Sequence, residues 1–211
     1  MNYYISDLHF FHYNVLKFDK RPFSSIEEMN KKLVENWNTT VGDEDSVYFL
    51  GDFSFGKAPE TTEILKSLKG HKILIKGNHD GRFLKHKPFL DCWDGIYDIL
   101  EVNDVVNDIP ITITLCHYPI LTFKRRYTDV NFHFYGHVHI TPDEKEIVKF
   151  AKEFAEFETK TNQNSKRLIY GDMEIKAKMY NVGCMTSYMN YTPQTAASII
   201  WNGEEYSLDQ K

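Results

Sequence analysis

Short clusters of aspartate, asparagine and histidine recur along the first two thirds of the chain, and such side chains can bind metal ions. Asp-Leu-His begins at Asp7, Gly-Asp at Gly51, and Gly-Asn-His-Asp at Gly77. A histidine at position 117 and a Gly-His-Val-His cluster from Gly136 follow. Carboxylate, amide and imidazole donors without cysteine suit Mn²⁺, Fe or Zn²⁺ better than a structural zinc bound by thiolates.

The candidate ligands are too many for a single ion. The set of seven comprises Asp7, His9, Asp52, Asn78, His117, His137 and His139. Two ions that share one carboxylate would use them all, which is the arrangement of two-metal hydrolases. Taken singly, a histidine after a strand is more often structural and Gly-Asp is a common turn. The metal hypothesis therefore depends on the whole set.

Each cluster follows a segment that is predicted to be a β-strand. These segments are rich in β-branched or aromatic residues and have strand length: Tyr3–Ser6, Ser46–Leu50, Lys72–Lys76, Ile111–Cys116 and Phe132–Tyr135. Ligands bind beyond the carboxyl ends of strands in open α/β sheets, so the clusters can converge. Residues i and i+2 of an extended chain point to the same side, so Asp7 with His9, and His137 with His139, can act together. The glycines at positions 51, 77 and 136 fit tight turns or close approaches to a ligand.

Helical patterns separate the strands and indicate a layered α/β fold. Ser25 and Glu28 form a predicted capping box, and an apolar stripe follows at helical spacing: Ile26, Met29, Leu33 and Trp37. A second helix is predicted from Pro59 to Lys69, with Gly70 as its stop signal.

The pattern changes after residue 140. A helix is predicted over Asp143–Lys160, within an insertion of residues 141–177. Either this helix covers one sheet edge, or it lies beside the ligand clusters as a lid or a homodimer contact, with residues 161–165 as its exposed tip. Lys178–Val182 and Ala197–Trp201 are predicted as strands, and Asn202-Gly203 as a hairpin turn.

The order of the clusters resembles that of the calcineurin-like metallophosphoesterase family. The similar motifs, Asp-x-His, Gly-Asp, Gly-Asn-His-Asp, His and Gly-His-x-His, span residues 7–139. The stretch from Ile5 to Phe23, with Tyr180-Asn181-Val182-Gly183, is similar to small stand-alone bacterial and phage members. The resemblance implies one α/β domain over residues 1–211, with two mixed β-sheets sandwiched between helices in four layers, αββα.

The resemblance also implies a site for two divalent ions, with Mn²⁺ expected first and Fe, Zn or Ni as alternatives. One ion would bind Asp7, His9, Asp52 and His139. The second would use Asp52 again, with Asn78, His117 and His137. Hydroxide activated by the ions would attack phosphorus, His79 would protonate the leaving group, and Asp80 would hold the His79 ring in orientation.

Departures from better-known relatives narrow the expected substrate. Protein Ser/Thr phosphatases and dinucleoside tetraphosphate hydrolases of this family carry Asp-Arg-Gly soon after Gly-Asp and a Glu at the position of Asp80; neither occurs here. The nuclease branch adds a long capping domain, for which 211 residues leave no room. We therefore expect a phosphodiesterase, or a broad phosphoesterase, for small or accessible esters, among them nucleotide-derived ones. Substrate contacts are predicted for His12, Asn14 and Arg125.

Two other classes of function compete with this hypothesis: a phosphomonoesterase of the same fold and a catalytically silent metal-bound scaffold. A one-metal hydrolase of the metallo-β-lactamase type is disfavoured because its His-x-His-x-Asp-His run is absent.

Composition places further bounds on function. Lys and Arg total 25 against 30 Asp and Glu, and the net charge of −5 argues against stable non-specific binding to nucleic acid. No run approaches the 18 or so apolar residues of a membrane span, and the chain reads straight into a strand without a signal peptide. Three cysteines without metal-finger spacing predict a reducing compartment, the cytoplasm, and no disulfide framework.

Overall fold

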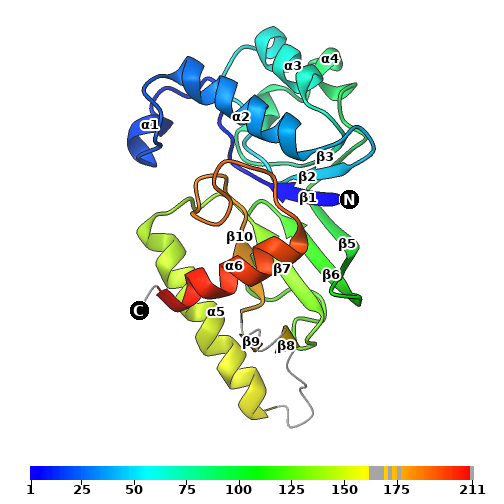
Figure 1. Cartoon of the computed structure of the whole chain (residues 1–211), viewed down its shortest axis with the longest axis vertical. Coiled ribbons are helices and arrows are strands. Elements are labelled where there is room, and N and C mark those ends of the chain that lie inside the picture. The colour runs from blue at the N-terminus through cyan, green and yellow to red at the C-terminus, as the bar shows by residue number, and fades with distance from the viewer. Residues whose placement is uncertain (162–168, 171–172, 175–176, 210–211) are drawn as a thin grey trace.

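Two four-stranded β-sheets form the centre of the computed structural model, which describes residues 1–161, 169–170, 173–174 and 177–209 (Figure 1). The first sheet has the order β1-β2-β3-β4, and its neighbouring strands are parallel. Its strands are β1 (Asn2–Ile5), β2 (Ser46–Phe49), β3 (His71–Ile75) and β4 (Gly95–Tyr97). An isolated antiparallel bridge joins Tyr4 of β1 to Gln194.

The second sheet is mixed and has the order β10-β7-β6-β5. β10 pairs parallel with β7, β7 pairs parallel with β6, and β6 pairs antiparallel with β5. Its strands are β5 (Ile99–Val106), β6 (Ile109–Cys116), β7 (Asn131–Tyr135) and β10 (Met179–Asn181). A separate antiparallel pair consists of β8 (Ile169–Tyr170) and β9 (Met173–Glu174).

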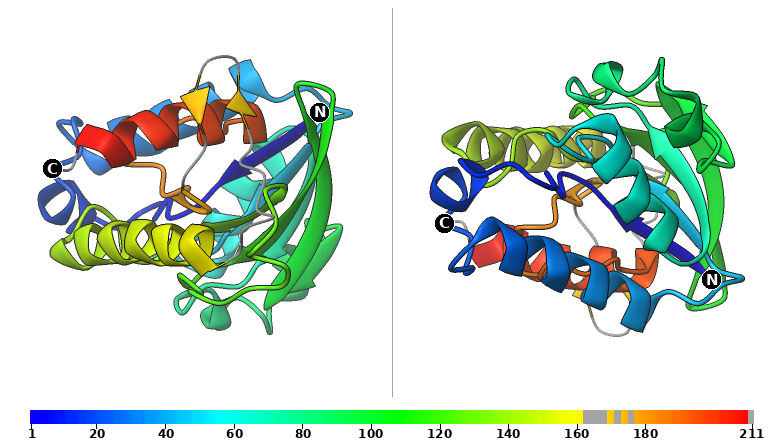
Figure 2. Two further views of the ribbon diagram at one scale, coloured as in Figure 1. Left: turned by 90° about the horizontal axis from the view of Figure 1, so that it is seen from below. Right: turned by 90° about the horizontal axis from the view of Figure 1, so that it is seen from above.

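Helices flank both sides of the sheets. In the two views of Figure 2, α2 and α6 lie on one side, and α3, α4 and α5 lie on the other. The helices are α1 (Val15–Phe18), α2 (Ile26–Thr40), α3 (Ala58–Ser67), α4 (Lys87–Leu90), α5 (Pro142–Thr161) and α6 (Ala196–Asp209), with a 3₁₀ turn at Asp80–Arg82. The predicted fold class, two β-sheets sandwiched between helices, is confirmed.

The inner faces of the two sheets share one apolar core. Tyr4 of β1 is fully buried and packs edge-to-face on Phe134 of β7, with ring centroids 5.1 Å apart. Its hydroxyl donates to Asp104 of β5 at 2.7 Å. One buried aromatic residue therefore contacts two strands of the facing sheet, which fixes how the sheets sit on each other.

The predicted helix signals act as expected in α2. Ser25 is the N-cap, and its side chain accepts a hydrogen bond from the Glu28 amide at 3.1 Å. The Glu28 carboxylate accepts from the amide of Ser24 at 2.7 Å. Met29, Leu33 and Trp37 are buried on one face, so this stripe attaches the helix to the core.

The C-terminal prediction is wrong. Residues Ala197–Trp201 and Asn202-Gly203 belong to helix α6, not to a strand and a hairpin turn. Ala196, Ile199, Ile200 and Gly203 are buried, and their spacing of three, four and seven residues defines one helical face. A Cβ on Gly203 would lie 2.5 Å from the Tyr180 ring. The glycine thus serves close packing of a helix on β10, whereas its sequence neighbours suggested a turn.

Strands β4 and β5 are absent from the sequence prediction. β5 has an exposed edge with alternating burial, so its mixed polar and apolar residues lack the strong signal of a buried strand. The connection to β6 passes through Asn107 and Asp108, both with positive φ, which are residues that tolerate this conformation in hairpin turns.

Other expectations from composition can be compared with the structure. All three cysteines are free, as expected. No helix in the described part of the chain combines the length and apolar character that a membrane span requires.

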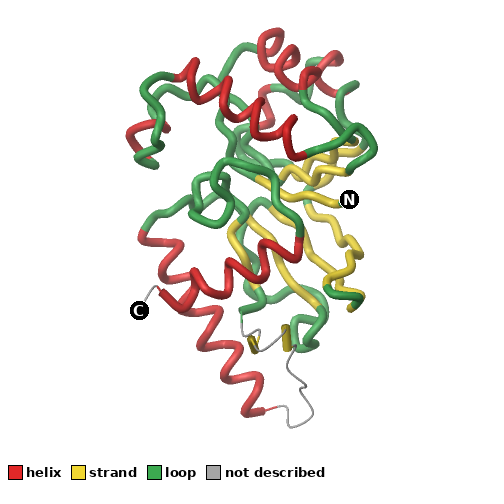
Figure 3. The backbone as a smooth tube through the Cα atoms, in the orientation of Figure 1, coloured by secondary structure: helices red, strands yellow, loops and turns green. Residues whose placement is uncertain are grey.

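Helix α5 confirms the helix predicted over Asp143–Lys160. Its buried Ala151 packs with Phe123, Tyr135 and Met179, so the helix covers β7 and β10. Phe150 and Phe157 on the same helix are 49% and 59% exposed. That residues 141–177 form an insertion, and that it acts as a lid or a homodimer contact, stay predictions. The exposed tip was predicted at residues 161–165, of which residues 162–165 lie outside the described part. Figure 3 shows loops where the strands of both sheets end.

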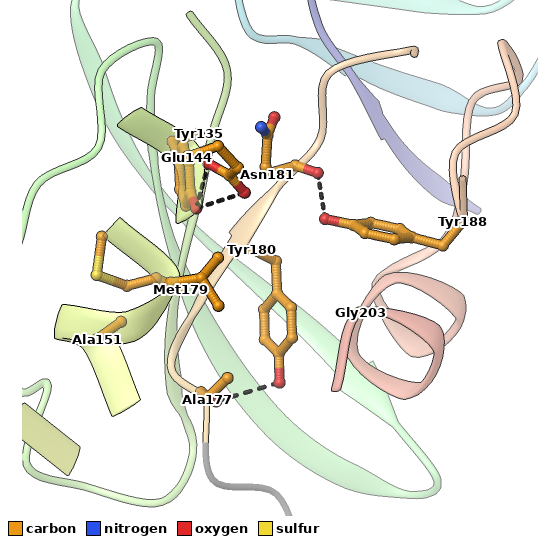
Figure 4. A pocket seen from close by; sticks show the side chains of 10 residues that line it. Tyr135, Glu144, Ala151, Ala177, Met179, Tyr180, Asn181, Tyr188 and Gly203 are labelled. Carbon is orange, nitrogen blue, oxygen red and sulfur yellow. Dashed lines mark hydrogen bonds between the residues drawn. The ribbon is translucent and has the colours of Figure 1, made fainter. Parts of the chain in front are cut away.

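One carboxyl group of α5 is buried in the protein interior. Glu144 is 3% exposed and accepts hydrogen bonds from the Tyr135 hydroxyl at 3.1 and 3.2 Å, beside a pocket also lined by Met179, Tyr180 and Asn181 (Figure 4). Burial raises the pKa of Glu144 to about 8, although the hydrogen bonds from Tyr135 oppose this shift. The protonated carboxyl is therefore the form that the fold favours.

Glu144→Gln is expected to stabilise the protein at alkaline pH. Because the folded pKa lies above the unfolded one, the stabilisation from protonated Glu144 is complete below about pH 4.5 and is lost as the pH rises through about 8. Neutral Gln avoids this loss, which amounts to roughly 5 kcal/mol above pH 9. Melting temperatures from pH 5 to 9 should show a gain that grows with pH, against exposed Glu153→Gln as control. Parallel curves for wild type and Glu144→Gln would contradict a raised pKa.

Candidate metal centre

The loops after five strands meet at one place between the sheets. The Asp7 amide donates to the Gly51 carbonyl at 3.0 Å, which joins the loops after β1 and β2. The Gly136 amide donates to the His117 carbonyl at 2.9 Å, which joins the loops after β6 and β7. The His137 amide donates to Asp7 Oδ2 at 3.1 Å and so connects the two sheets. The convergence predicted from the sequence is therefore observed.

One group of potential ligand atoms comes from Asp7, His9 and His139. His9 Nε2 lies 3.0 Å from His139 Nε2. Asp7 Oδ1 lies 3.7 Å from the first of these nitrogens and 3.5 Å from the second. Two imidazole nitrogens and one carboxylate oxygen thus face a common point, as three ligands of one ion would.

A second group comes from Asp7, Asp52 and His117. Asp52 Oδ2 lies 3.6 Å from His117 Nε2 and 3.9 Å from His9 Nε2. This oxygen therefore sits between the two groups, in the position of a shared ligand. Asn78 Oδ1 is 3.1 Å from His117 Nε2, and the His137 ring lies beside that of His117, with centroids 5.1 Å apart.

The Asp7 carboxylate provides a test of whether these residues fit a metal ion. Its Oδ2 accepts from Ser6 Oγ at 2.6 Å and from the His137 amide. Its Oδ1 is buried and has no hydrogen-bond partner in the described part of the chain. A buried carboxylate oxygen without a partner is costly, and a cation bound between Asp7, His9 and His139 would satisfy it.

The backbone of the ligand candidates is unusual. Positive φ angles occur at five of the seven candidates, with values from 51° to 71°: Asp7, His9, Asp52, His137 and His139. Residues with a side chain adopt this left-handed conformation at a cost, and such strain concentrates at functional sites.

Two of the predicted glycines are required by close contacts. A Cβ on Gly136 would lie 2.3 Å from Asp7 Oδ2 and from Ser6 Oγ. Gly51 has a φ of +90°, and a Cβ there would lie 2.5 Å from the Gly77 amide nitrogen. Both positions leave no room for a side chain, which confirms the close backbone approach expected from the sequence.

The protonation of this cluster follows from its burial and its charges. Burial alone would raise the pKa of Asp7, but the facing imidazoles of His139 and His9 outweigh it and hold the pKa well below the ordinary value. Burial disfavours the charged form of His139, yet its hydrogen bond to Asp19 and the charge of the nearby Asp7 carboxylate raise its pKa to about 10. Burial lowers the pKa of His9. A metal ion that bound here would have to displace the proton that the raised pKa places on His139.

His79 lies at the mouth of the site. Its Nε2 is 3.9 Å from Asp52 Oδ2, and its side chain is 39% exposed. The ring packs on Phe55 with centroids 4.5 Å apart, and the Arg82 guanidinium lies over the same phenyl ring at 4.9 Å. His79 is thus close to the candidate ligands and still accessible from solvent.

Asp80 makes different contacts from those expected. Its carboxylate accepts from the backbone amides of Asp52, Phe53 and Gly77 at 2.8–3.0 Å, so it holds the loops after β2 and β3 together rather than the His79 ring. Burial raises the pKa of Asp80 to about 6 despite these hydrogen bonds. Phe55 packs on the His79 ring, and the sequence analysis did not assign this residue to the site.

The predicted substrate contacts lie in different places. His12 stacks on Phe55, with centroids 3.9 Å apart, and lies 5.5 Å from the His9 ring. Asn14 is exposed at the start of α1, and Arg125 is exposed in a turn between β6 and β7. Within the described ranges, no hydrogen bond, ion pair or ring contact joins Asn14 or Arg125 to a candidate ligand. The structure thus brings only His12 to the edge of the site.

Comparisons with known proteins agree with this geometry. The family model of the calcineurin-like phosphoesterases matches residues 3–141. Over 80 residues the chain is 54% identical to the uncharacterized protein MJ1445 of Methanocaldococcus jannaschii, covering 37% of this chain and 46% of that protein. Over 82 residues it is 34% identical to the gene 66 protein of Mycobacterium phage L5, covering 37% and 39%. The matches thus span less than half the length of these relatives.

A solved structure with a similar fold is the protein of unknown function AQ665 from Aquifex aeolicus, with a TM-score of 0.51 and 25% identity. The similarity covers 92% of this chain and 94% of that one. The matched family model spans every candidate ligand, from the turn after β1 to the turn after β7. The chain therefore belongs to the calcineurin-like phosphoesterase family.

Proposed function

We propose that this phosphoesterase uses two divalent metal ions and hydrolyses phosphodiesters in preference to monoesters. The observation that carries the proposal is the pair of ligand groups that share Asp7, with Asp52 Oδ2 between them. Asp7, His9, Asp52 and His139 would hold one ion, and Asp52, Asn78, His117 and His137 the other. Mn²⁺ is the proposed ion, with Fe, Zn or Ni as alternatives, because the donors are carboxylate, amide and imidazole.

When bound, the two ions supply a nucleophilic water at neutral pH and neutralise charge on the phosphate. The chain itself contributes a proton donor at His79 Nε2, which is partly exposed beside Asp52. An imidazole can protonate the leaving oxygen because its ordinary pKa is near neutrality. Phe55 packs against the His79 ring and so restricts the directions from which that proton reaches the ester.

The proposed preference for diesters is supported by Arg21, a buried cation beside the site whose hydrogen bonds are all made within the protein. Arg21 donates to Asp19, to the Asp7 carbonyl and to the Leu8 carbonyl, so its guanidinium is not directed at substrate. A phosphodiester carries one negative charge, whereas a monoester dianion gains more from fixed cations. Small or nucleotide-derived esters that reach His79 past His12 are the proposed substrates.

The proposal is tested with metal-depleted protein to which Mn²⁺ is returned. Hydrolysis of bis-p-nitrophenyl phosphate and of p-nitrophenyl phosphate is followed side by side. We expect turnover that depends on Mn²⁺, with the larger kcat/KM for the diester. A larger kcat/KM for the monoester would replace the diester proposal by a phosphomonoesterase. Bound Mn²⁺ without turnover of either ester would favour a silent scaffold.

A further inference from the structure

A buried ion pair outside the ligand clusters contacts both the first and the last of these clusters. Asp19 and Arg21 follow α1 and are 6% and 4% exposed. Asp19 Oδ1 lies 2.7 Å from His139 Nδ1, and Arg21 donates to the backbone carbonyls of Asp7 and Leu8 at 2.8 Å. One short loop is therefore bonded to the turns after β1 and β7, which belong to different sheets.

The contact from Asp19 determines which nitrogen of His139 faces the proposed ion. An ionised carboxylate can only accept a hydrogen bond, so His139 Nδ1 must carry the proton in this contact. In the neutral ring His139 Nε2 then carries the lone pair, and it is the atom that lies 3.5 Å from Asp7 Oδ1 and 3.0 Å from His9 Nε2. The tautomer that suits Asp19 is also the one that suits metal binding.

Arg21 in turn fixes the carboxylate of Asp19. Its Nε and Nη2 both lie 3.0 Å from Asp19 Oδ2, which leaves Oδ1 for His139. Its Nη1 also lies 3.6 Å from the Met29 sulfur of helix α2. Every nitrogen of the guanidinium has a partner, so the planar group cannot rotate without breaking several bonds.

We propose that Asp19 is a positioning residue that orients His139 for metal binding, and that Arg21 locks it in place. This inference rests on the two-metal site proposed above. Histidines that bind metals commonly donate their second ring N–H to a carboxylate, and removal of that carboxylate typically weakens metal affinity by 10–100-fold. A buried ion pair is also weak evidence of stabilisation in itself, so the contact with His139 accounts for it better than stability does.

Asp19→Asn tests the proposal, because it removes the charge while keeping a side chain of the same shape. Mn²⁺ binding is measured by titration calorimetry on metal-depleted protein, and bound metal is counted after desalting. We expect wild type to bind two ions and Asp19→Asn to bind one of them about 10–100-fold more weakly. Asp104→Asn is the matched control, since Asp104 is a hydrogen-bonded, partly buried carboxylate on β5 that accepts from Tyr4.

A measurement on wild type keeps the proposal testable if Asp19→Asn does not fold. The protein is labelled with ¹⁵N-histidine, loaded with diamagnetic Zn²⁺ and studied by NMR, and the His139 signals are assigned by comparison with His139→Gln. The ring proton of His139 should lie on Nδ1, and the Asp19 carboxylate should shift its resonance downfield. A proton on Nε2 would overturn the proposal. Unchanged affinity for both ions in a folded Asp19→Asn variant would also overturn it, while leaving the two-metal function intact. If wild type bound no ion, the proposed function itself would fail, and this inference with it.

Discussion

Asp52→Asn is expected to abolish hydrolysis and to weaken the binding of both metal ions. Asp52 Oδ2 lies between His9 and His117, at 3.9 and 3.6 Å from their Nε2 atoms, so the proposed ions share it. Loss of this shared charge should reduce kcat/KM by more than about 10²-fold, the upper range for residues that merely support a ligand.

The direction of the asparagine amide explains why so small a change is severe. Asp52 Oδ1 accepts a hydrogen bond from the His79 amide at 2.9 Å. In the variant the amide oxygen must keep that contact, because two N–H groups cannot bond each other. The NH₂ group then takes the place of Oδ2, and a hydrogen-bond donor faces the position of the cations.

Elemental analysis after desalting gives the metal content, and bis-p-nitrophenyl phosphate gives the activity. Asp94→Asn is the control, because it makes the same chemical change at another carboxylate. Asp94 accepts from the amide of Lys72, which lies near the start of β3, whereas the ligand cluster follows the end of that strand. Asp52→Asn protein that retained two tightly bound ions would contradict the shared-ligand role.

The strands and helices that position the site could be predicted from sequence because local signals and burial agree there. Strands β1, β2, β3, β6 and β7 are short and rich in β-branched or aromatic residues. The buried residues of β2 and β3 are all apolar: Val47, Phe49, Leu74 and Ile75. Helix α2 begins at its predicted cap and buries its predicted stripe. Because side-chain chemistry follows the carboxyl end of each of these strands, their convergence could be predicted as well.

The contacts that support the ligands could not be predicted in the same way. Asp19 lies between Phe18 and Lys20 at the end of α1, and nothing in these neighbours indicates that it meets His139, 120 residues away. Phe55 reads as one more aromatic residue after β2, yet it contacts the rings of His9, His12 and His79. Such contacts depend on how distant loops pack, which periodicity and spacing do not encode.

Asp80 shows how a motif can be identified correctly while its contacts are not. Its place after His79 suggested a side-chain partner for that histidine. The 3₁₀ turn at Asp80–Arg82 instead directs its carboxylate inward, onto three backbone amides of the neighbouring loops. Adjacent residues in a turn point in different directions, so sequence proximity is weak evidence of contact.

His79→Ala is expected to reduce hydrolysis without loosening the metal ions. The hydrogen bond that holds Asp52 Oδ1 comes from the His79 backbone amide, so it survives removal of the imidazole. Phe55, from the loop after β2, packs on the imidazole. Arg82, from the turn after β3, packs on the other ring, that of Phe55, and neither residue is a candidate ligand. The variant therefore separates the proton donor from the ligand set.

The size of the loss should depend on the leaving group. General acid catalysis typically contributes about 10²–10⁴-fold, so kcat for methyl phenyl phosphate, whose phenoxide needs a proton, should fall by that order. Bis-p-nitrophenyl phosphate should lose much less, because nitrophenoxide leaves readily without one. His71→Ala removes an exposed imidazole at the opposite end of β3 and should change neither rate. An equal loss on both esters, with metal content unchanged, would restrict His79 to phosphate binding, because a group that only binds the phosphate does not distinguish one leaving oxygen from another.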